Sequence, residues 1–131
     1  TFPSQNVVAR DAGVELAGYE SWNAPDPTYT ERVYYHEALV ADENGRLTAT
    51  IHNPHFPIAG GERPLSVHLS WQQSQLPKLV QWKMSGAGVH VLGIEPANCY
   101  VEGRAVERER GTLQMLAPGE KRTFKLEFSI E

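Results

Sequence analysis

The chain has 131 residues, of which 40% are hydrophobic and 21% are charged, a balance typical of one globular domain with a buried core. Its net charge of -4 argues against a nucleic-acid partner, because no basic surface is available to neutralise phosphates. A single cysteine excludes an internal disulfide framework and a cysteine-rich zinc site, and no stretch reaches the roughly 18 apolar residues of a membrane span.

Residues 1–31 contain several prolines and glycines and little regular alternation. This lead segment is therefore predicted to be mostly irregular, with at most a short strand over residues 14–19. It shows neither the basic nor the apolar stretch of a signal peptide, which favours a cytoplasmic location. The β-sandwich is predicted to occupy residues 32–131.

The pattern changes to strands at residue 32. Residues 32–40 are apolar at both parities, as expected for a strand that is covered on both faces. Asp42–Gly45 ends in Asn-Gly, a pair that readily forms a type I′ turn, and residues 46–53 alternate cleanly. These features predict a hairpin whose inward side chains are Leu47, Ala49 and Ile51.

After a connection rich in proline and glycine, further strands are predicted over residues 65–71, 78–84, 89–94, 112–116 and 122–130. Phe124, Leu126, Phe128 and Ile130 are expected to face inward from the last strand. The arginines and glutamates between residues 102 and 110 are interpreted as a solvated loop. The sequence thus predicts an all-β protein, an antiparallel β-sandwich of about seven or eight strands.

The strand 89–94 ends abruptly in Glu95-Pro96-Ala97-Asn98. Proline cannot donate a ladder hydrogen bond, so pairing is expected to stop here and to leave a carboxylate at the end of the strand. A strand end can hold an acid or base rigidly toward a ligand, which makes Glu95 a candidate general base. The alternative is a carboxylate that accepts turn N–H groups or pairs with an arginine.

Gln81 and Lys83 share one face of their strand, and Trp82 lies on the other. An aromatic ring and hydrogen-bonding side chains suit a sugar, which has C–H bonds on its faces and hydroxyl groups around its rim. We expect Trp82 in the core, which leaves Gln81 and Lys83 for a ligand. Asn98 is expected either to contact a ligand hydroxyl or to satisfy the backbone of the turn.

The chain has five histidines. His52 and His55 are separated by a proline and cannot form a helical ligand pair, and no third ligand is positioned, so we expect no metal site and no cofactor. His36 is a candidate acid-base partner from another strand. No glycine-rich phosphate loop or nucleophile elbow is present.

The order of several motifs resembles the C-terminal half of aldose 1-epimerase-like proteins. The motifs, found within residues 31–131, are IHNP, an LP followed by QWK, VLGIEPAN and LQMLAPGEKRTFKLEFSI. The closest resemblance is to an uncharacterised bacterial family within the galactose mutarotase-like superfamily. It implies the C-terminal part of a large antiparallel β supersandwich that binds sugars across a concave sheet.

Characterised mutarotases use a glutamate near the end of the chain to remove the anomeric hydroxyl proton, and a histidine from the earlier half to protonate the ring oxygen. The resemblance places Glu95 at the position of that base, within GIEPAN rather than the usual Leu-Glu-Thr-Gln pattern. The implied function is sugar binding, with interconversion of anomers in the full-length protein. A non-catalytic carbohydrate-binding module and an interaction sandwich are the alternatives.

No segment of the chain resembles the half of the family that carries the acid histidine. An incomplete sandwich would expose strand edges and apolar faces. We therefore expect self-association or pairing with a missing N-terminal half.

Overall fold

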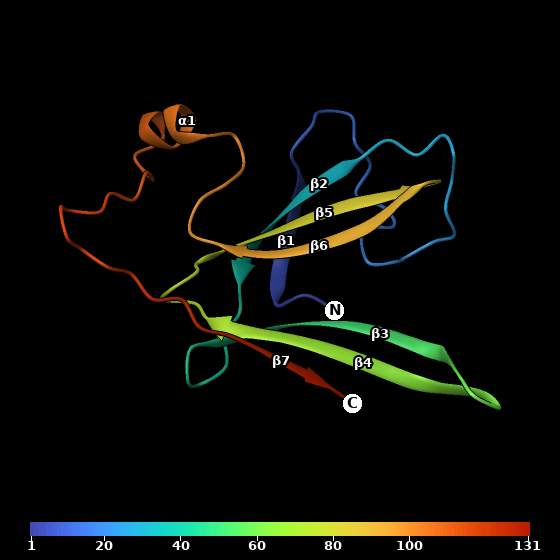
Figure 1. Cartoon of the computed structure of the whole chain (residues 1–131). Coiled ribbons are helices and arrows are strands. Elements are labelled where there is room, and N and C mark those ends of the chain that lie inside the picture. The colour runs from blue at the N-terminus through green and yellow to red at the C-terminus, as the bar shows by residue number, and fades with distance from the viewer.

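The computed structural model describes residues 1–131 as two antiparallel sheets, one above the other, and one short helix (Figure 1). Sheet A has the strand order β1-β2-β5-β6, and sheet B has the order β3-β4-β7. The predicted all-β antiparallel sandwich is confirmed. In chain order the elements are β1 (Ser4–Ala9), β2 (Arg32–Leu39), β3 (Arg46–Ile58), β4 (Gly61–Gln72), β5 (Lys78–Gly86), β6 (Val89–Ala97), α1 (Arg104–Glu109) and β7 (Leu126–Ile130).

The main core lies between the two sheets, where alternate apolar residues of β3 and β4 meet Leu79 of β5. The Trp71 indole Nε1 donates to the backbone oxygen of Leu76 at 3.0 Å and ties the β4–β5 connection to this core. The buried members are Leu47, Ala49, Leu69, Trp71, Leu76 and Leu79. We call the side of sheet A that meets sheet B its inner face.

A smaller core covers the outer face of sheet A. There Val33 and Tyr35 of β2 and Val80 of β5 are buried, and Trp82 and Tyr100 pack against them. Because Tyr34 and His36 are buried on the inner face, β2 is covered on both sides, as predicted.

The predicted hairpin between β2 and β3 is wrong. A turn forms here, with φ of 73° at Gly45 and a hydrogen bond of 3.0 Å from the Gly45 N–H to the Asp42 oxygen, but it is not of type I′, because φ at Asn44 is not positive. It joins a strand of sheet A to a strand of sheet B, however, so the two strands do not pair. The left-handed φ of 48° at Ala38 interrupts the regular ladder between β1 and β2, and the chain leaves sheet A after Leu39, which still pairs with Ser4.

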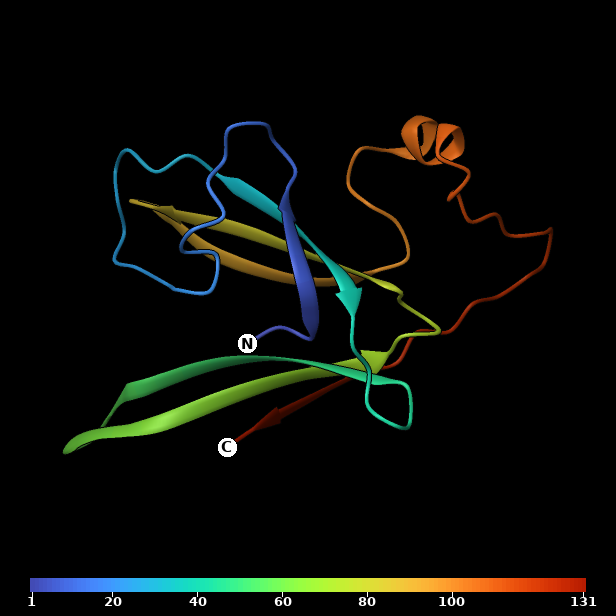
Figure 2. The ribbon, with the colours of Figure 1, turned by 180° about the vertical axis from the view of Figure 1, so that it is seen from behind.

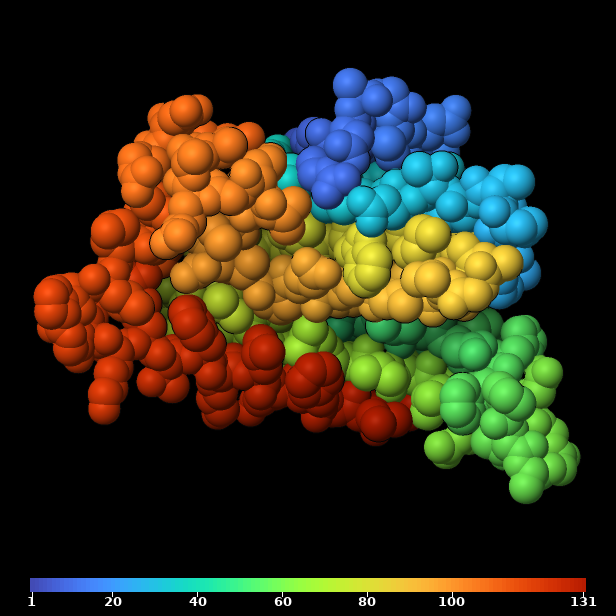
Figure 3. All heavy atoms as spheres, turned by 45° about the horizontal axis from the view of Figure 1, so that its top comes forward, coloured from blue at the N-terminus to red at the C-terminus, as the bar shows by residue number.

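The predicted connection after residue 53 is instead part of a long hairpin. β3 continues to Ile58 and β4 begins at Gly61. Pro54 falls in a register shift between Asn53 and Phe56, which an edge strand such as β3 tolerates. The tip of this hairpin projects beyond the rest of the molecule (Figure 3).

The N-terminal segment is only partly irregular. β1 lies within it and pairs antiparallel with β2. The short strand expected over residues 14–19 is absent, because Gly13 and Gly18 adopt φ of 83° and 84° and turn the chain. Residues 10–31 instead loop around one end of sheet A (Figure 2).

The strand predicted over residues 112–116 does not form. The N–H groups of Thr112 and Leu113 donate to the Glu107 oxygen at 2.9 and 3.1 Å, so this backbone completes the end of α1 rather than a sheet. β7 is confined to Leu126–Ile130. The helix α1 has six residues, and no helix is long and apolar enough to cross a membrane.

Candidate functional site

The predicted site residues are divided between the two faces of sheet A. Residue pairs across β5 and β6 match Val80 with Glu95 and Gln81 with Ile94, and neighbouring residues of a strand point to opposite faces. Glu95 therefore lies on the outer face. Gln81 and Lys83 lie on the inner face.

Glu95 projects from the outer face near the end of β6. It is half-buried and takes part in no ion pair of the chain. Its oxygens are also not among the buried atoms that lack a partner, so the carboxylate reaches solvent. The sequence allowed either a carboxylate that is free for a ligand or one that binds turn N–H groups or an arginine. The structure has the first, since Glu95 binds neither the turn nor an arginine.

Gly93 makes room for this carboxylate. A Cβ atom at position 93 would lie 2.5 Å from Glu95 Oε1 and 3.2 Å from Trp82 Cβ. Gly93 is the partner of Trp82 across the β5–β6 ladder. The carboxylate of Glu95 and the side chain of Trp82 therefore flank one position that has no side chain.

Trp82 is half-buried rather than a core residue. Its indole Nε1 donates to Glu31 Oε2 at 3.0 Å, and Nη2 of Arg10 lies 3.5 Å from the other oxygen of Glu31. We expected Trp82 to be buried and Gln81 and Lys83 to be accessible to a ligand. The opposite is found, because Gln81 and Lys83 are only 1% and 2% exposed. The reversal follows from the choice of face: sheet B and the N-terminal loop cover the side that holds Gln81 and Lys83.

Two tyrosines extend the outer face toward α1. The rings of Tyr35 and Tyr100 lie 4.4 Å apart, and the Lys78 amino group lies 4.2 Å from the centre of the Tyr100 ring. Burial raises the pKa of both tyrosine hydroxyls, and the carboxylate of Glu102 adds to this effect. Both hydroxyls are therefore protonated at neutral pH.

The prediction of a solvated loop between residues 102 and 110 is wrong for Glu107. This residue is 1% exposed, and its carboxylate accepts from the Thr112 hydroxyl at 2.6 Å and from the Tyr100 N–H at 3.0 Å. These hydrogen bonds, the Thr112 one first, lower the pKa of Glu107. The loop around α1 is thereby fixed against Tyr100, a long-range role that a run of alternating charges does not reveal.

His36 and Gln81 do come together, but on the inner face. The Nε2 atom of His36 lies 3.2 Å from Gln81 Oε1, and its Nδ1 atom lies 2.9 Å from Ser4 Oγ. The Gln81 amide donates to the Tyr19 oxygen at 2.8 Å. Burial lowers the pKa of His36. His36 is thus a buried neutral side chain on the side of the sheet opposite to Glu95.

Lys83 and Asn98 have different surroundings. The amino group of Lys83 donates to the backbone oxygens of Gly18 and Ser21, both at 2.6 Å, and so holds the N-terminal loop. Asn98 is half-buried in the loop after β6. No group of three or more histidine, cysteine or carboxylate side chains is placed to hold a metal ion.

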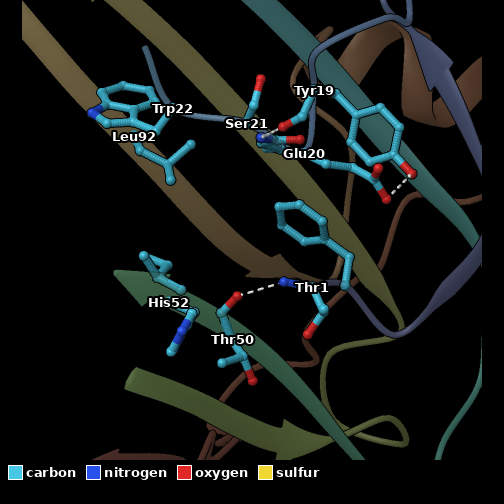
Figure 4. Close-up of a pocket in the computed structure, with 11 residues that line it drawn as sticks. Thr1, Tyr19, Glu20, Ser21, Trp22, Thr50, His52 and Leu92 are labelled. Carbon is cyan, nitrogen blue, oxygen red and sulfur yellow. Dashed lines mark hydrogen bonds between the residues drawn. The ribbon is translucent and has the colours of Figure 1, made fainter. Parts of the chain in front are cut away.

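Five cavities of the molecule are well formed, and Glu95 lines none of them. One cavity, of about 180 Å³, lies between the N-terminal loop and β3 (Figure 4). There the Thr1 amino group donates to the Thr50 oxygen at 2.6 Å. Another, of about 240 Å³, lies between the sheets and is lined only by hydrophobic residues, among them Ile51, Leu92 and Phe128.

The arrangement defines an all-β sandwich that carries a carboxylate without a partner beside aromatic side chains on its outer face. The chain belongs to the family described as domain of unknown function (DUF4432), whose model matches residues 1–130. No curated protein and no solved structure matches the chain. Family membership thus assigns no activity, and the resemblance to aldose 1-epimerase-like proteins remains a hypothesis.

Proposed function

We propose that the outer face of sheet A binds a carbohydrate, with Glu95 as the general base of an aldose 1-epimerase-like exchange of anomers. The observation that carries this proposal is the half-buried carboxylate of Glu95, which has no ion-pair partner and lies over Gly93 beside Trp82. A carboxylate with a structural role accepts hydrogen bonds within the chain, as that of Glu107 does. The lone pairs of Glu95 are instead available to a ligand.

The neighbouring side chains suit an aldose. The indole of Trp82 offers a flat apolar surface for the C–H bonds of one sugar face, and Glu95 can accept a hydrogen bond from a sugar hydroxyl. When that hydroxyl is the anomeric one, Glu95 takes its proton as the bond between the anomeric carbon and the ring oxygen breaks. A proton donor must protonate the ring oxygen, and the open-chain aldehyde then closes on either face.

The chain offers no histidine as that donor. His36 and His90 point to the inner face of sheet A, and His52, His55 and His68 lie on or beside the strands of sheet B. The residues of this chain therefore account for binding and for the base. Within the proposed supersandwich, the proton donor comes from another segment or from a partner chain. The proposed location of the protein is the cytoplasm.

The same observation favours a second candidate, a carbohydrate-binding module without catalysis. Binding requires the platform and the hydrogen-bond acceptor but no paired acid. The two functions differ only in whether the exchange of anomers is accelerated.

Sugar binding is tested by titrating the protein with galactose and glucose while following tryptophan fluorescence and amide chemical shifts by NMR. Glu95→Gln removes a charged hydrogen-bond acceptor, which is worth about 1.5–3 kcal/mol, so binding should weaken roughly tenfold or more. Glu109→Gln, which changes an exposed carboxylate of α1, is the matched control and should leave binding unchanged. No response to either sugar, or equal losses in both variants, would contradict the proposal.

Catalysis is tested separately in the complete protein, in which the proton donor is present, by saturation transfer between the signals of the two sugar anomers. Acceleration that disappears in Glu95→Gln supports the base role. A protein that binds sugar without accelerating exchange is instead a binding module.

A further inference from the structure

A polar cavity of about 380 Å³ lies beside the inner face of sheet A, on the side of the sheet opposite to Glu95. Arg32 of β2 and Lys83 and Ser85 of β5 contribute to its wall, and Asp26 and Tyr29 contribute from the N-terminal loop. The cavity is not part of the site described above.

Two cations face each other in this cavity. Arg32 and Lys83 are direct partners across the β2–β5 ladder. Neither takes part in an ion pair. The buried Lys83 amino group donates to backbone oxygens of the loop and lies 6.0 Å from the centre of the Trp22 ring, and the Arg32 guanidinium lies 5.2 Å from the centre of the Tyr29 ring. Like charges directly opposite each other destabilise a sheet unless an anion compensates them. Burial lowers the pKa of Lys83, and the charge of Arg32 lowers it further.

Two buried hydroxyl groups of the same cavity also lack partners. Ser85 is 1% exposed, and neither its Oγ atom nor the hydroxyl of Tyr29 makes a hydrogen bond of ordinary geometry, although the two hydroxyls lie close enough for Ser85 to influence the pKa of Tyr29. A buried polar group without a partner costs about 1–3 kcal/mol. Two cations and two free hydroxyl donors thus line one space.

We propose that this cavity binds an oxyanion, namely the phosphate or carboxylate group of a small molecule. The guanidinium of Arg32 can donate two parallel hydrogen bonds to such a group, and Lys83 adds a point charge. The hydroxyls of Ser85 and Tyr29 donate to the remaining oxygen lone pairs.

The nearby carboxylates do not compensate the charges of Arg32 and Lys83. Asp26 Oδ1 accepts from the N–H and the hydroxyl of Thr28, at 2.8 and 2.7 Å, so the carboxylate belongs to the turn. Glu15 influences the pKa of Arg32 but lies beyond ion-pair distance. Because the cavity and Glu95 lie on opposite faces, this inference does not depend on the proposed carbohydrate function.

The experiment measures binding of inorganic phosphate and of acetate by calorimetry and by thermal unfolding, at constant ionic strength set with chloride. Phosphate or acetate should raise the unfolding temperature beyond the effect of chloride. Stronger binding of phosphate identifies a phosphate-bearing ligand, and stronger binding of acetate identifies a carboxylate-bearing one. The absence of any effect beyond that of chloride overturns the proposal.

Two variants and a control assign the effect to the cavity. Arg32→Gln should abolish the rise in unfolding temperature, whereas Arg63→Gln, at an exposed position of β4, should keep it. Ser85→Ala removes only a hydroxyl without a partner, so it should fold as stably as the unmodified protein but bind roughly tenfold more weakly. Equal binding by all three variants overturns the proposal, because it indicates unspecific anion effects.

Discussion

At the scale of single residues, Gly93 decides where the carboxylate of Glu95 lies. The space that a side chain at position 93 would fill is taken by Glu95 Oε1 and bordered by Trp82 Cβ. Glycine is otherwise unfavourable in a strand, so a close approach of other atoms explains its presence here.

We predict that Gly93→Ala displaces the carboxylate of Glu95. The added Cβ would meet Glu95 Oε1 at 2.5 Å, so the carboxylate must move, but because it is the end of a flexible side chain the free energy of unfolding should change by less than about 1 kcal/mol. Sugar binding should weaken although Glu95 and Trp82 are unchanged. Urea denaturation and the sugar titration measure the two effects.

Gly61→Ala is the matched control for this substitution. Gly61 also lies in a strand, but nothing is within 4 Å of its Cβ position and its φ is not positive. This variant should be neutral or more stable by up to about 1 kcal/mol. Similar losses of sugar binding in both variants would mean that the space over Gly93 has no special role.

At the scale of elements, β7 is an exposed edge. Glu131 and Ser66 exchange two backbone hydrogen bonds, so by alternation the odd residues of β7 bond to β4 and the even ones direct their N–H and C=O groups away from it. Leu126, Phe128 and Ile130 face inward as predicted, since each is paired with an inward residue of β4. They are nevertheless 45%, 70% and 69% exposed. Figure 3 shows β7 uncovered along this side of the molecule. Such an edge is a template for strand pairing.

Charge selects one register for pairing with a second copy of the chain. Antiparallel pairing about Phe128 sets Leu126 opposite Ile130 and Lys125 opposite Glu131 of the second copy, and all even backbone groups are then bonded. A shift by two residues sets Glu127 opposite either Glu127 or Glu131 of the second copy. Like charges opposite each other are unfavourable, so the first register is the one we predict.

Cysteine cross-linking tests both the pairing and its register. In a Cys99→Ser background, which removes the exposed free thiol, a mixture of Glu127→Cys and Ser129→Cys proteins should form a disulfide-linked dimer. Neither variant alone should do so, because only position 127 of one copy faces position 129 of the other. Non-reducing electrophoresis and mass spectrometry detect the products. Cross-linking of Glu127→Cys alone would show the shifted register, and no cross-linking at all would exclude pairing through β7.

At the scale of the whole molecule, His36 links three segments. It is buried beneath Phe2, whose ring lies 4.1 Å from its own, and it contacts Ser4 of β1 and Gln81 of β5. Burial is the main cause that lowers the pKa of His36, and the N-terminal ammonium adds to it. Folding therefore favours the neutral imidazole.

The free energy of unfolding should consequently decrease as the pH is lowered, because of His36. The folded pKa of His36 lies below its unfolded value near 6.5, so its contribution is complete above about pH 6.5 and declines as the unfolded chain takes up a proton below it. The slope is at most about 1.4 kcal/mol per pH unit. His36→Gln should flatten the dependence of the unfolding free energy on pH between 7.5 and 5.5, as followed by urea denaturation.

His55→Gln serves as the comparison for this measurement. His55 is an exposed side chain beside Glu62 on the β3–β4 hairpin, so His55→Gln should leave the dependence of the unfolding free energy on pH unchanged. An unchanged slope in His36→Gln would mean that other groups set the pH dependence.

Local pattern accounts for a good part of the fold. The sequence Ala117-Pro118-Gly119-Glu120 is typical of a turn, and a turn forms there, with φ of 79° at Gly119 and a hydrogen bond from the Glu120 N–H to the Ala117 oxygen. The alternation in β3 and β4 correctly placed Leu47, Ala49, Leu69 and Trp71 in the core. Local pattern failed where a distant contact competes, as at residues 112–116, whose backbone serves α1 instead of a sheet.

The sequence by itself determined which side chains share a face, because the period of a strand is two and this separates Glu95 from Ile94 and Trp82 from Gln81. Only the tertiary structure decided which face of sheet A is covered. Both parities of β2 are apolar, so the local pattern is equally compatible with either choice. Contacts with sheet B and with the N-terminal loop, far away in the chain, buried Gln81, Lys83 and His36 and left Glu95 accessible.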